Sequence, residues 1–194
     1  MVRLDWRVAL KALAGFLAGL ALWVMLSPLY DGLLARAAEF SIRTFERPPV
    51  TRLRLASDNY VTVDRADFDP RSKRPAVAFH DLTFNFLLLT ALFATSRKVF
   101  SDRNIGGFLI AAGILSLTHV LGAVTEVMSI YVTKLGLWSR IHYGPVERNV
   151  WTVANHFYRL VLMYAIAFAL WWIFRDASAA AAGAAGKTSK KRKK

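Results

Sequence analysis

Four long apolar stretches separated by polar segments dominate the chain. They cover residues 8–26, 82–95 with an apolar lead-in from 76, 105–132 and 150–174. A bilayer core of about 30 Å needs roughly twenty helical residues, so the first, third and fourth stretches are long enough to cross it. The second must be extended backward through residues 79–81 or thin the membrane locally. The pattern predicts an all-α membrane protein, a bundle of four transmembrane helices.

The first stretch has one bulky face and one face of small residues that includes Gly15 and Gly19. Small residues let helix backbones approach closely inside a membrane. We therefore expect this face to pack inside the bundle. After it, Ser27-Pro28 predicts the end of the helix, because proline lacks an amide donor and disfavours helical geometry in the residue before it.

Between the first two stretches, the spacing of apolar residues changes from a helical period to alternation. Apolar residues between 29 and 45 recur every three to five positions with charges between them, which predicts an interfacial amphipathic helix ending by Pro48-Pro49. Residues 51–55 and 60–64 are rich in β-formers and flank a turn, which predicts a β-hairpin. Because an isolated hairpin is only marginally stable, we expect it to pair with a strand near 76–79, or to lie against the interfacial helix or a partner protein.

The formal charge of +13 is distributed in a way that argues for a membrane and against nucleic acid. Basic residues precede the first stretch, fill the link between the second and third, and follow the fourth, ending in the cluster at 187–194. With four spans, these segments share one side, and short basic loops remain in the cytoplasm. The sequence thus predicts a bacterial cytoplasmic membrane protein with both termini cytoplasmic. Lys134, Arg140 and Arg148 on the opposite side conflict mildly with this rule.

These boundaries give an expected domain organisation. Residues 1–26 hold the cytoplasmic N-terminus and the first transmembrane helix, and 27–80 form an extracytoplasmic insert of interfacial helix and hairpin. Residues 81–174 hold helices two to four, and 175–194 form a basic, disordered cytoplasmic tail. The tail is expected to attach weakly to anionic lipid.

Ionisable and amide side chains interrupt the apolar stretches, and the topology gives them depths. Glu126 and Arg159 fall at matching depths on consecutive antiparallel helices, so we predict that they form an ion pair or are bridged through His156. One interpretation is a buried polar cluster that fixes helix register; the other is a cavity for a substrate head group. The candidate cluster comprises Asn85, His119, Glu126, Asn155, His156 and Arg159.

The chain contains no cysteine, which excludes disulfides, thiolate nucleophiles and iron–sulfur clusters. No recognised catalytic spacing is present, and membrane-embedded hydroxyls usually bond to helix backbones. His119 and His156 differ in depth, which argues against a bis-histidine haem. The sequence therefore predicts no catalytic residue, no metal and no cofactor.

Residues 8–96 carry an architectural resemblance. A first span, an outer segment with a short hairpin, and the run Leu82-Thr83-Phe84-Asn85-Phe86 entering a basic loop resemble small bacterial membrane proteins found beside exosortase systems. The resemblance implies an accessory membrane protein of envelope protein or polysaccharide processing. An exosortase itself would need a cysteine nucleophile, which this chain lacks.

Two functions follow as hypotheses. The leading one is a non-catalytic, multi-pass accessory or assembly subunit of a bacterial cell-envelope complex, in contact with membrane lipids. It would dock a protein partner through its insert, with Leu53, Leu55, Tyr60, Val61 and Val63 as the binding residues. The alternative is a membrane enzyme or carrier that acts on a lipid-linked or anionic substrate in the outer leaflet through the polar cluster.

Overall fold

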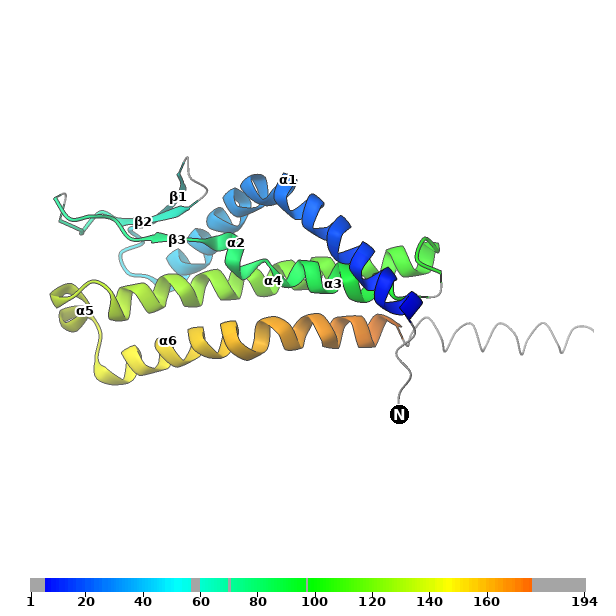
Figure 1. The fold of residues 1–194 in the computed structure, drawn as a ribbon. Helices are drawn as coiled ribbons and strands as arrows, with labels where there is room; N and C mark the ends of the chain where they lie inside the picture. Colours follow the sequence, from blue (N-terminus) through cyan, green and yellow to red (C-terminus); the bar gives the residue numbers. More distant parts are fainter. Residues whose placement is uncertain (1–5, 57–59, 70, 97, 176–194) are drawn as a thin grey trace, which may run out of the picture. The chain divides into compact units, whose positions relative to one another are not determined.

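The computed structural model describes residues 6–56, 60–69, 71–96 and 98–175, and the predicted basic tail lies outside them apart from its first residue. Most described residues are helical (Figure 1). Three helical runs are long and apolar enough to cross a membrane: α1 (Trp6–Phe45), α4 (Asp102–Thr133) and the run Pro145–Arg175. The last run combines α6 (Pro145–Phe157), the π-helical η1 (Tyr158–Leu162) and the turns that follow. The expectation of a helical membrane protein with a small sheet is therefore supported.

The second apolar stretch is broken rather than one helix. It forms α2 (Phe79–Leu82) and α3 (Asn85–Ala94), and its predicted lead-in at Ala76–Val77 is strand β3. The backbone N–H of Thr83 and its hydroxyl both donate to the carbonyl oxygen of His80, at 3.3 and 3.0 Å, which closes α2. The resulting helix is shorter than a full span. The number of four spans remains a prediction.

Helix α1 corrects the prediction at Pro28. The helix does not end at Ser27-Pro28 but continues through it for 40 residues in total, about 60 Å at the helical rise per residue. The predicted interfacial helix is the second half of α1. Proline inside a helix costs about 3 kcal/mol, and here the buried side chains after it, Leu34, Ala35, Ala38 and Ile42, offset this loss by packing in a core.

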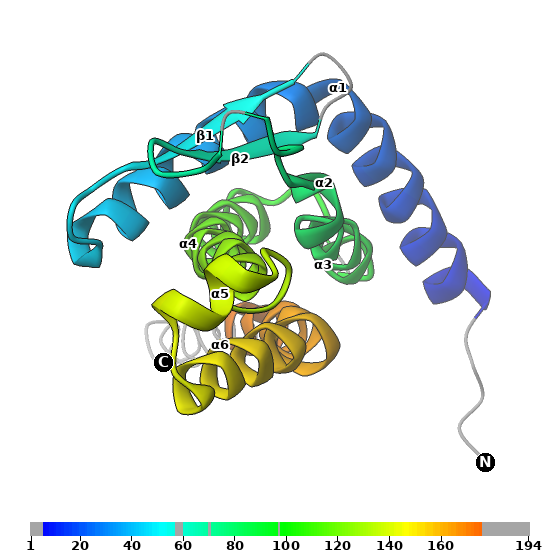
Figure 2. The same ribbon diagram turned by 90° about the vertical axis from the view of Figure 1, so that its left-hand side faces the viewer.

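The predicted hairpin is confirmed and gains a third strand. Strands β1 (Thr51–Leu55) and β2 (Val61–Arg65) pair antiparallel, and β3 pairs antiparallel with the other edge of β2. Glu39 and Glu46 cover the open edge of β1: the N–H of Leu53 donates to Glu39 Oε2 at 2.8 Å and that of Thr51 to Glu46 Oε2 at 2.9 Å. Figure 2 shows β1 and β2 beside the second half of α1. Because these two edge amides are occupied, the edge offers fewer donors to another strand.

A buried ion network joins the sheet to the helices near it. Arg65, with a side chain 8% exposed, donates to Glu46 and Asp67, and its guanidinium lies 5.1 Å from the ring centre of Tyr131. The hydrogen bond from Arg65 holds the pKa of the Asp67 carboxyl below its ordinary value. The hydroxyl of Thr51 donates to Glu46 Oε1 at 2.7 Å. Removing Arg65 would leave the nearly buried Glu46 carboxylate without its cation.

The described chain divides into two compact units, neither continuous in sequence. The sheet unit is Val24–Phe84 with Ser116–Met163; the helical unit is the described part of Met1–Trp23, Asn85–Leu115 and Tyr164–Lys194. This division differs from the predicted one, because the insert shares a core with parts of α4 and α6 instead of folding alone.

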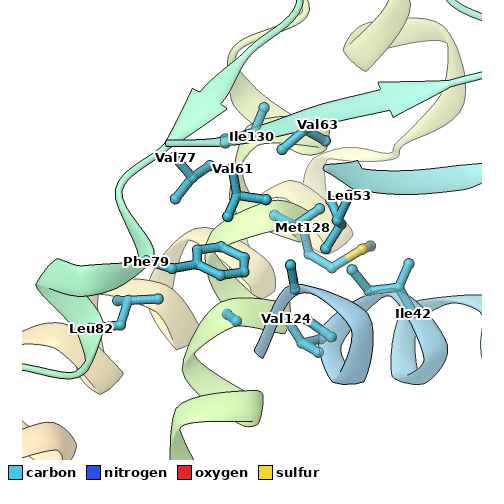
Figure 3. Close-up of a cluster of buried hydrophobic side chains, with 14 of the residues drawn as sticks. Ile42, Leu53, Val61, Val63, Val77, Phe79, Leu82, Val124, Met128 and Ile130 are labelled. Carbon is cyan, nitrogen blue, oxygen red and sulfur yellow. The ribbon is translucent and has the colours of Figure 1, made fainter. Parts of the chain in front are cut away.

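One hydrophobic core holds the sheet unit together (Figure 3). The inward side chains of all three strands meet buried residues of α1, α2 and α4, which is how a sheet too small to be stable alone becomes stable. The labelled members of this core are Ile42, Leu53, Val61, Val63, Val77, Phe79, Leu82, Val124, Met128 and Ile130.

In the helical unit, α1 and α3 approach closely along the small-residue face. A methyl group at Gly15 would overlap Ala94, and one at Gly19 would overlap Thr90. The residue order shows that the two helices are antiparallel here. The predicted role of Gly15 and Gly19 in helix packing is confirmed.

Candidate functional site

A continuous series of polar groups runs through the sheet unit. Helix α1 contributes Asp31, α2 contributes His80 and Asp81, α4 contributes Glu126, and the Pro145–Arg175 run contributes Asn155 and Arg159. We call these six residues the polar chain. Each comes from a helix whose other side chains build the core, so packing fixes the position of its polar groups.

The expected ion pair is present at one end of the polar chain. Arg159 Nη1 lies 3.2 Å from Glu126 Oε2, and Asn155 Nδ2 donates to the same oxygen at 2.8 Å. Asn155 also donates to the carbonyl oxygen of Thr125 at 3.3 Å. Glu126 is only 9% exposed at its side chain, whereas Arg159 is 43% exposed. The two donors compensate the desolvation of a nearly buried carboxylate.

The sequence also allowed that His156 bridges Glu126 and Arg159, and this prediction is wrong. Its Nδ1 lies 2.7 Å from the carbonyl oxygen of Thr152, one turn back on α6, and its side chain is exposed. Successive helical residues point about 100° apart, so the helix turns Asn155 toward α4 and His156 away from it. The bridging role belongs to Asn155.

Arg159 has a second acidic neighbour, which extends the polar chain. Its Nη2 lies 3.9 Å from Asp81 Oδ2, and Asp81 Oδ1 lies 3.6 Å from His80 Nε2. His80 Nδ1 in turn lies 3.9 Å from Asp31 Oδ2. The series therefore leads from the exposed Asp81 through the His80 imidazole to a second aspartate, Asp31, which is fully buried.

Asp31 is the most unusual group of the polar chain. It is 0% exposed, and neither of its carboxylate oxygens accepts a hydrogen bond within the described residues. A buried carboxylate without donors is costly when charged. The His80 imidazole faces it, with Nδ1 at 3.9 Å from Asp31 Oδ2, which is beyond hydrogen-bond distance.

His119 lies against Tyr30 of α1, and Asn85 lies in the helical unit. His119 is 2% exposed, and its Nδ1 lies 2.7 Å from the hydroxyl oxygen of Tyr30, a residue of α1. Asn85 begins α3 and belongs to the helical unit, where it is 1% exposed. Of the six candidates, the structure brings together Glu126, Asn155 and Arg159.

Sequence reasoning missed Tyr30, Asp31, His80 and Asp81. Asp31 could have been noticed as the single carboxylate in the apolar run 29–35. Because the sequence predicts that the helix ends at Pro28, this carboxylate looks like a charge at the membrane interface. His80 and Asp81 were treated only as the start of a span. On the short helix α2, His80 faces Asp31 of α1, and Asp81 faces Arg159.

The charge of the polar chain favours a proton or a cation over an anion. It holds three carboxylates, one guanidinium and one imidazole. A phosphate or carboxylate ligand would have to draw Arg159 away from both Glu126 and Asp81. Within the described residues, no group of three or more acidic, histidine or cysteine side chains is arranged to hold a metal ion.

The predicted partner-binding residues divide into two sets. Leu53, Val61 and Val63 are buried, at 6%, 0% and 0% exposure, and contribute to the core of the sheet unit. Leu55 and Tyr60 are 36% and 42% exposed. A partner that approaches the sheet can therefore contact only the second set without unfolding it.

The fold defines a helical membrane protein with a small three-stranded sheet, and its polar chain lies in the sheet unit. The chain matches no protein-family model, no curated protein and no solved structure.

Proposed function

We propose that the protein is a non-catalytic accessory subunit of a bacterial cell-envelope complex, spanning the cytoplasmic membrane with both termini in the cytoplasm. It docks a partner through the sheet unit. The observation that supports this most directly is an exposed apolar and basic face on the second half of α1.

The second half of α1 has apolar side chains on two sides, and among the described residues one side is buried in the core while the other is exposed. Leu34, Ala38 and Ile42 are buried in the core of the sheet unit. On the other side Leu33 is 55% exposed and Phe40 is 74% exposed. In the proposed topology the first half of α1 crosses the bilayer, and its second half follows on the outer side. Large apolar side chains that are neither buried nor in hydrocarbon mark an interaction surface.

The same face carries positive charge. Arg36 and Arg43 lie within one turn of Phe40 and are exposed, although Arg43 also pairs with Glu39 at 3.2 Å. On the sheet, the outward side chains of β1 are Arg52 and Arg54. Aromatic and arginine side chains are enriched where proteins bind one another. The matching partner surface is apolar with acidic groups around it.

The alternative, an enzyme or carrier for an anionic substrate in the outer leaflet, has less support from the polar chain. Arg159 was its proposed contact for phosphate or carboxylate, and that guanidinium already faces Glu126 and Asp81. An anion would add to the excess of negative charge there.

Site-specific photo-cross-linking in the native host tests the docking surface. Benzoyl-phenylalanine is placed at Phe40, and a matched chain carries it at Phe100, a phenylalanine of the helical unit that is 89% exposed, against 74% for Phe40. We expect a discrete adduct with an envelope protein from position 40 and not from position 100.

Phe40→Asp should remove co-purification of that protein without reducing membrane insertion, since Phe40 makes no core contact. No adduct at position 40, or the same adduct from position 100, would refute the proposal. Deleting the hairpin is a poorer test, because Val61 and Val63 belong to the core.

A further inference from the structure

A polar cavity lies between the end of α4 and the start of α6, in the sheet unit and apart from the polar chain. Its volume is about 540 Å³. We propose that it binds the phosphate of an anionic phospholipid head group. The residues that carry the argument are Thr133, Ser139, Arg140, Arg148, Asn149 and Thr152.

Two arginines give the cavity its positive charge. Neither Arg140 nor Arg148 forms an ion pair within the described residues, and Nε of Arg148 is buried without a hydrogen-bond partner. The nearest acidic residue in sequence, Glu147, uses its carboxylate to accept the N–H of Gly144 at 2.9 Å and does not line the cavity. A buried guanidinium donor without an acceptor is costly. A phosphate oxygen is the acceptor that its geometry fits best.

The surrounding groups fit an anion as well. The cavity includes Pro145, the first residue of α6, where the free N–H groups of a helix carry partial positive charge. The hydroxyls of Thr133 and Thr152 already donate to backbone carbonyls, so in this arrangement they offer a phosphate no donor. The amide of Asn149 adds a donor at the rim. Arg140 and Arg148 remain the strongest attraction for an anion.

Exposed apolar side chains on two helices that line the cavity favour a lipid over a soluble phosphate. Val146, Val150 and Val153 follow one another along α6 and are 74%, 58% and 65% exposed. Leu137 and Ile141 on α5 (Leu137–His142) are 73% and 69% exposed. A head group in the cavity would place its acyl chains along such a surface. Trp and Tyr side chains favour this interfacial level, and Trp138, Tyr143 and Trp151 lie in the same segment.

The proposal also accounts for the charges that conflicted with the topology. Arg140 and Arg148 fall on the side that the charge rule keeps poor in cations. A role in binding lipid phosphate is a reason for cations to occur there.

Native mass spectrometry of the full-length protein in nonionic detergent tests the proposal. The probes are short-chain phosphatidylglycerol, short-chain phosphatidylcholine and inorganic phosphate. We expect phosphatidylglycerol to bind more tightly than phosphatidylcholine, and Arg140→Gln and Arg148→Gln each to weaken it roughly tenfold or more, since one charge-assisted hydrogen bond is worth about 1.5–3 kcal/mol. Arg52→Gln and Arg54→Gln remove the same charge from an exposed strand and should change the affinity less than twofold.

Three results would overturn the proposal. They are unchanged affinity in both cavity variants, equal losses in the strand variants, and displacement of phosphatidylglycerol by an equal concentration of inorganic phosphate, which would make a soluble anion the ligand. If Arg148→Gln does not fold, Arg140→Gln decides, because Arg140 is exposed and supports no core contact.

Discussion

At the scale of single residues, Glu126 and Arg159 differ in what they lose when the partner is removed. Glu126 is nearly buried and depends on donors from Arg159 and Asn155, whereas Arg159 is half-exposed and also faces Asp81. A buried carboxylate that loses its cation pays most of its desolvation cost. A half-exposed guanidinium that loses one carboxylate is still solvated.

We therefore predict an asymmetric double-mutant cycle. Arg159→Met should lower the free energy of unfolding by about 1–3 kcal/mol, and Glu126→Gln by less, because the glutamine oxygen still accepts from Asn155. The double variant should return to the level of Glu126→Gln. Thermal unfolding in detergent measures all three. Additive losses would show that the pair does not stabilise the fold as an ion pair.

The sequence was sufficient to predict this pair but not its neighbours. Residues 126 and 159 lie on two long helices whose order and direction follow from the apolar stretches, so their depths could be compared. Asp31 and His80 lie on elements whose positions depended on two local features, the continuation of α1 through Pro28 and the break after α2. Neither feature follows from hydrophobic periodicity.

At the scale of elements, the sheet depends on charge as much as on apolar packing. Glu46 accepts from Arg65, from the Thr51 hydroxyl and from two backbone amides at the start of β1. Arg65 then holds Asp67 at the end of β2. These contacts join α1 to both strands of the hairpin.

The lowered pKa of Asp67 predicts how the sheet unit responds to acid. A carboxyl whose pKa is lower in the folded state stabilises the fold above its unfolded pKa of about 3.9 and loses this contribution as the pH falls through the folded value. Asp67→Asn should thus destabilise the protein at pH 7 by no more than about 1 kcal/mol, since Asp67 is 39% exposed. The gap between the two proteins should close below about pH 4. Thermal unfolding across this range measures the gap, and parallel curves would contradict the assignment.

The elements themselves were predicted unevenly. Alternation and turn residues were sufficient for β1 and β2, because strand periodicity is local. The predicted end at Pro28 was wrong because the core contacts of Leu34, Ala38 and Ile42 outweigh the local cost of proline. The break at Thr83 depends on one threonine bonding back to His80, a competition between side chain and backbone that sequence patterns do not resolve.

At the scale of the whole molecule, three long apolar helices are sufficient to indicate a membrane protein, but they do not determine which segments lie on which side of the membrane. The broken segment Phe79–Ala94, which holds α2 and α3, is shorter than a full span, and whether it crosses decides the side of the link between α3 and α4. Four crossings put the α3–α4 link opposite the sheet and keep both ends of the chain on one side. If α3 does not cross, that link lies on the same side as the sheet.

The lack of cysteine makes this choice measurable, because any single introduced thiol reports its own side. Lys73→Cys, Lys98→Cys and Lys134→Cys each replace an exposed lysine. With four spans, a membrane-impermeant maleimide added outside intact cells should label positions 73 and 134 but not 98, which should react only after the membrane is permeabilised. If α3 does not cross, positions 73 and 98 will react alike. Lys73 and Lys134 line one pocket of the sheet unit, so positions 73 and 134 should react alike in either case. A difference between these two positions would contradict the packing of the residues after α4 against the sheet, which includes the contact of Phe68 with Trp138 at 5.4 Å between ring centres.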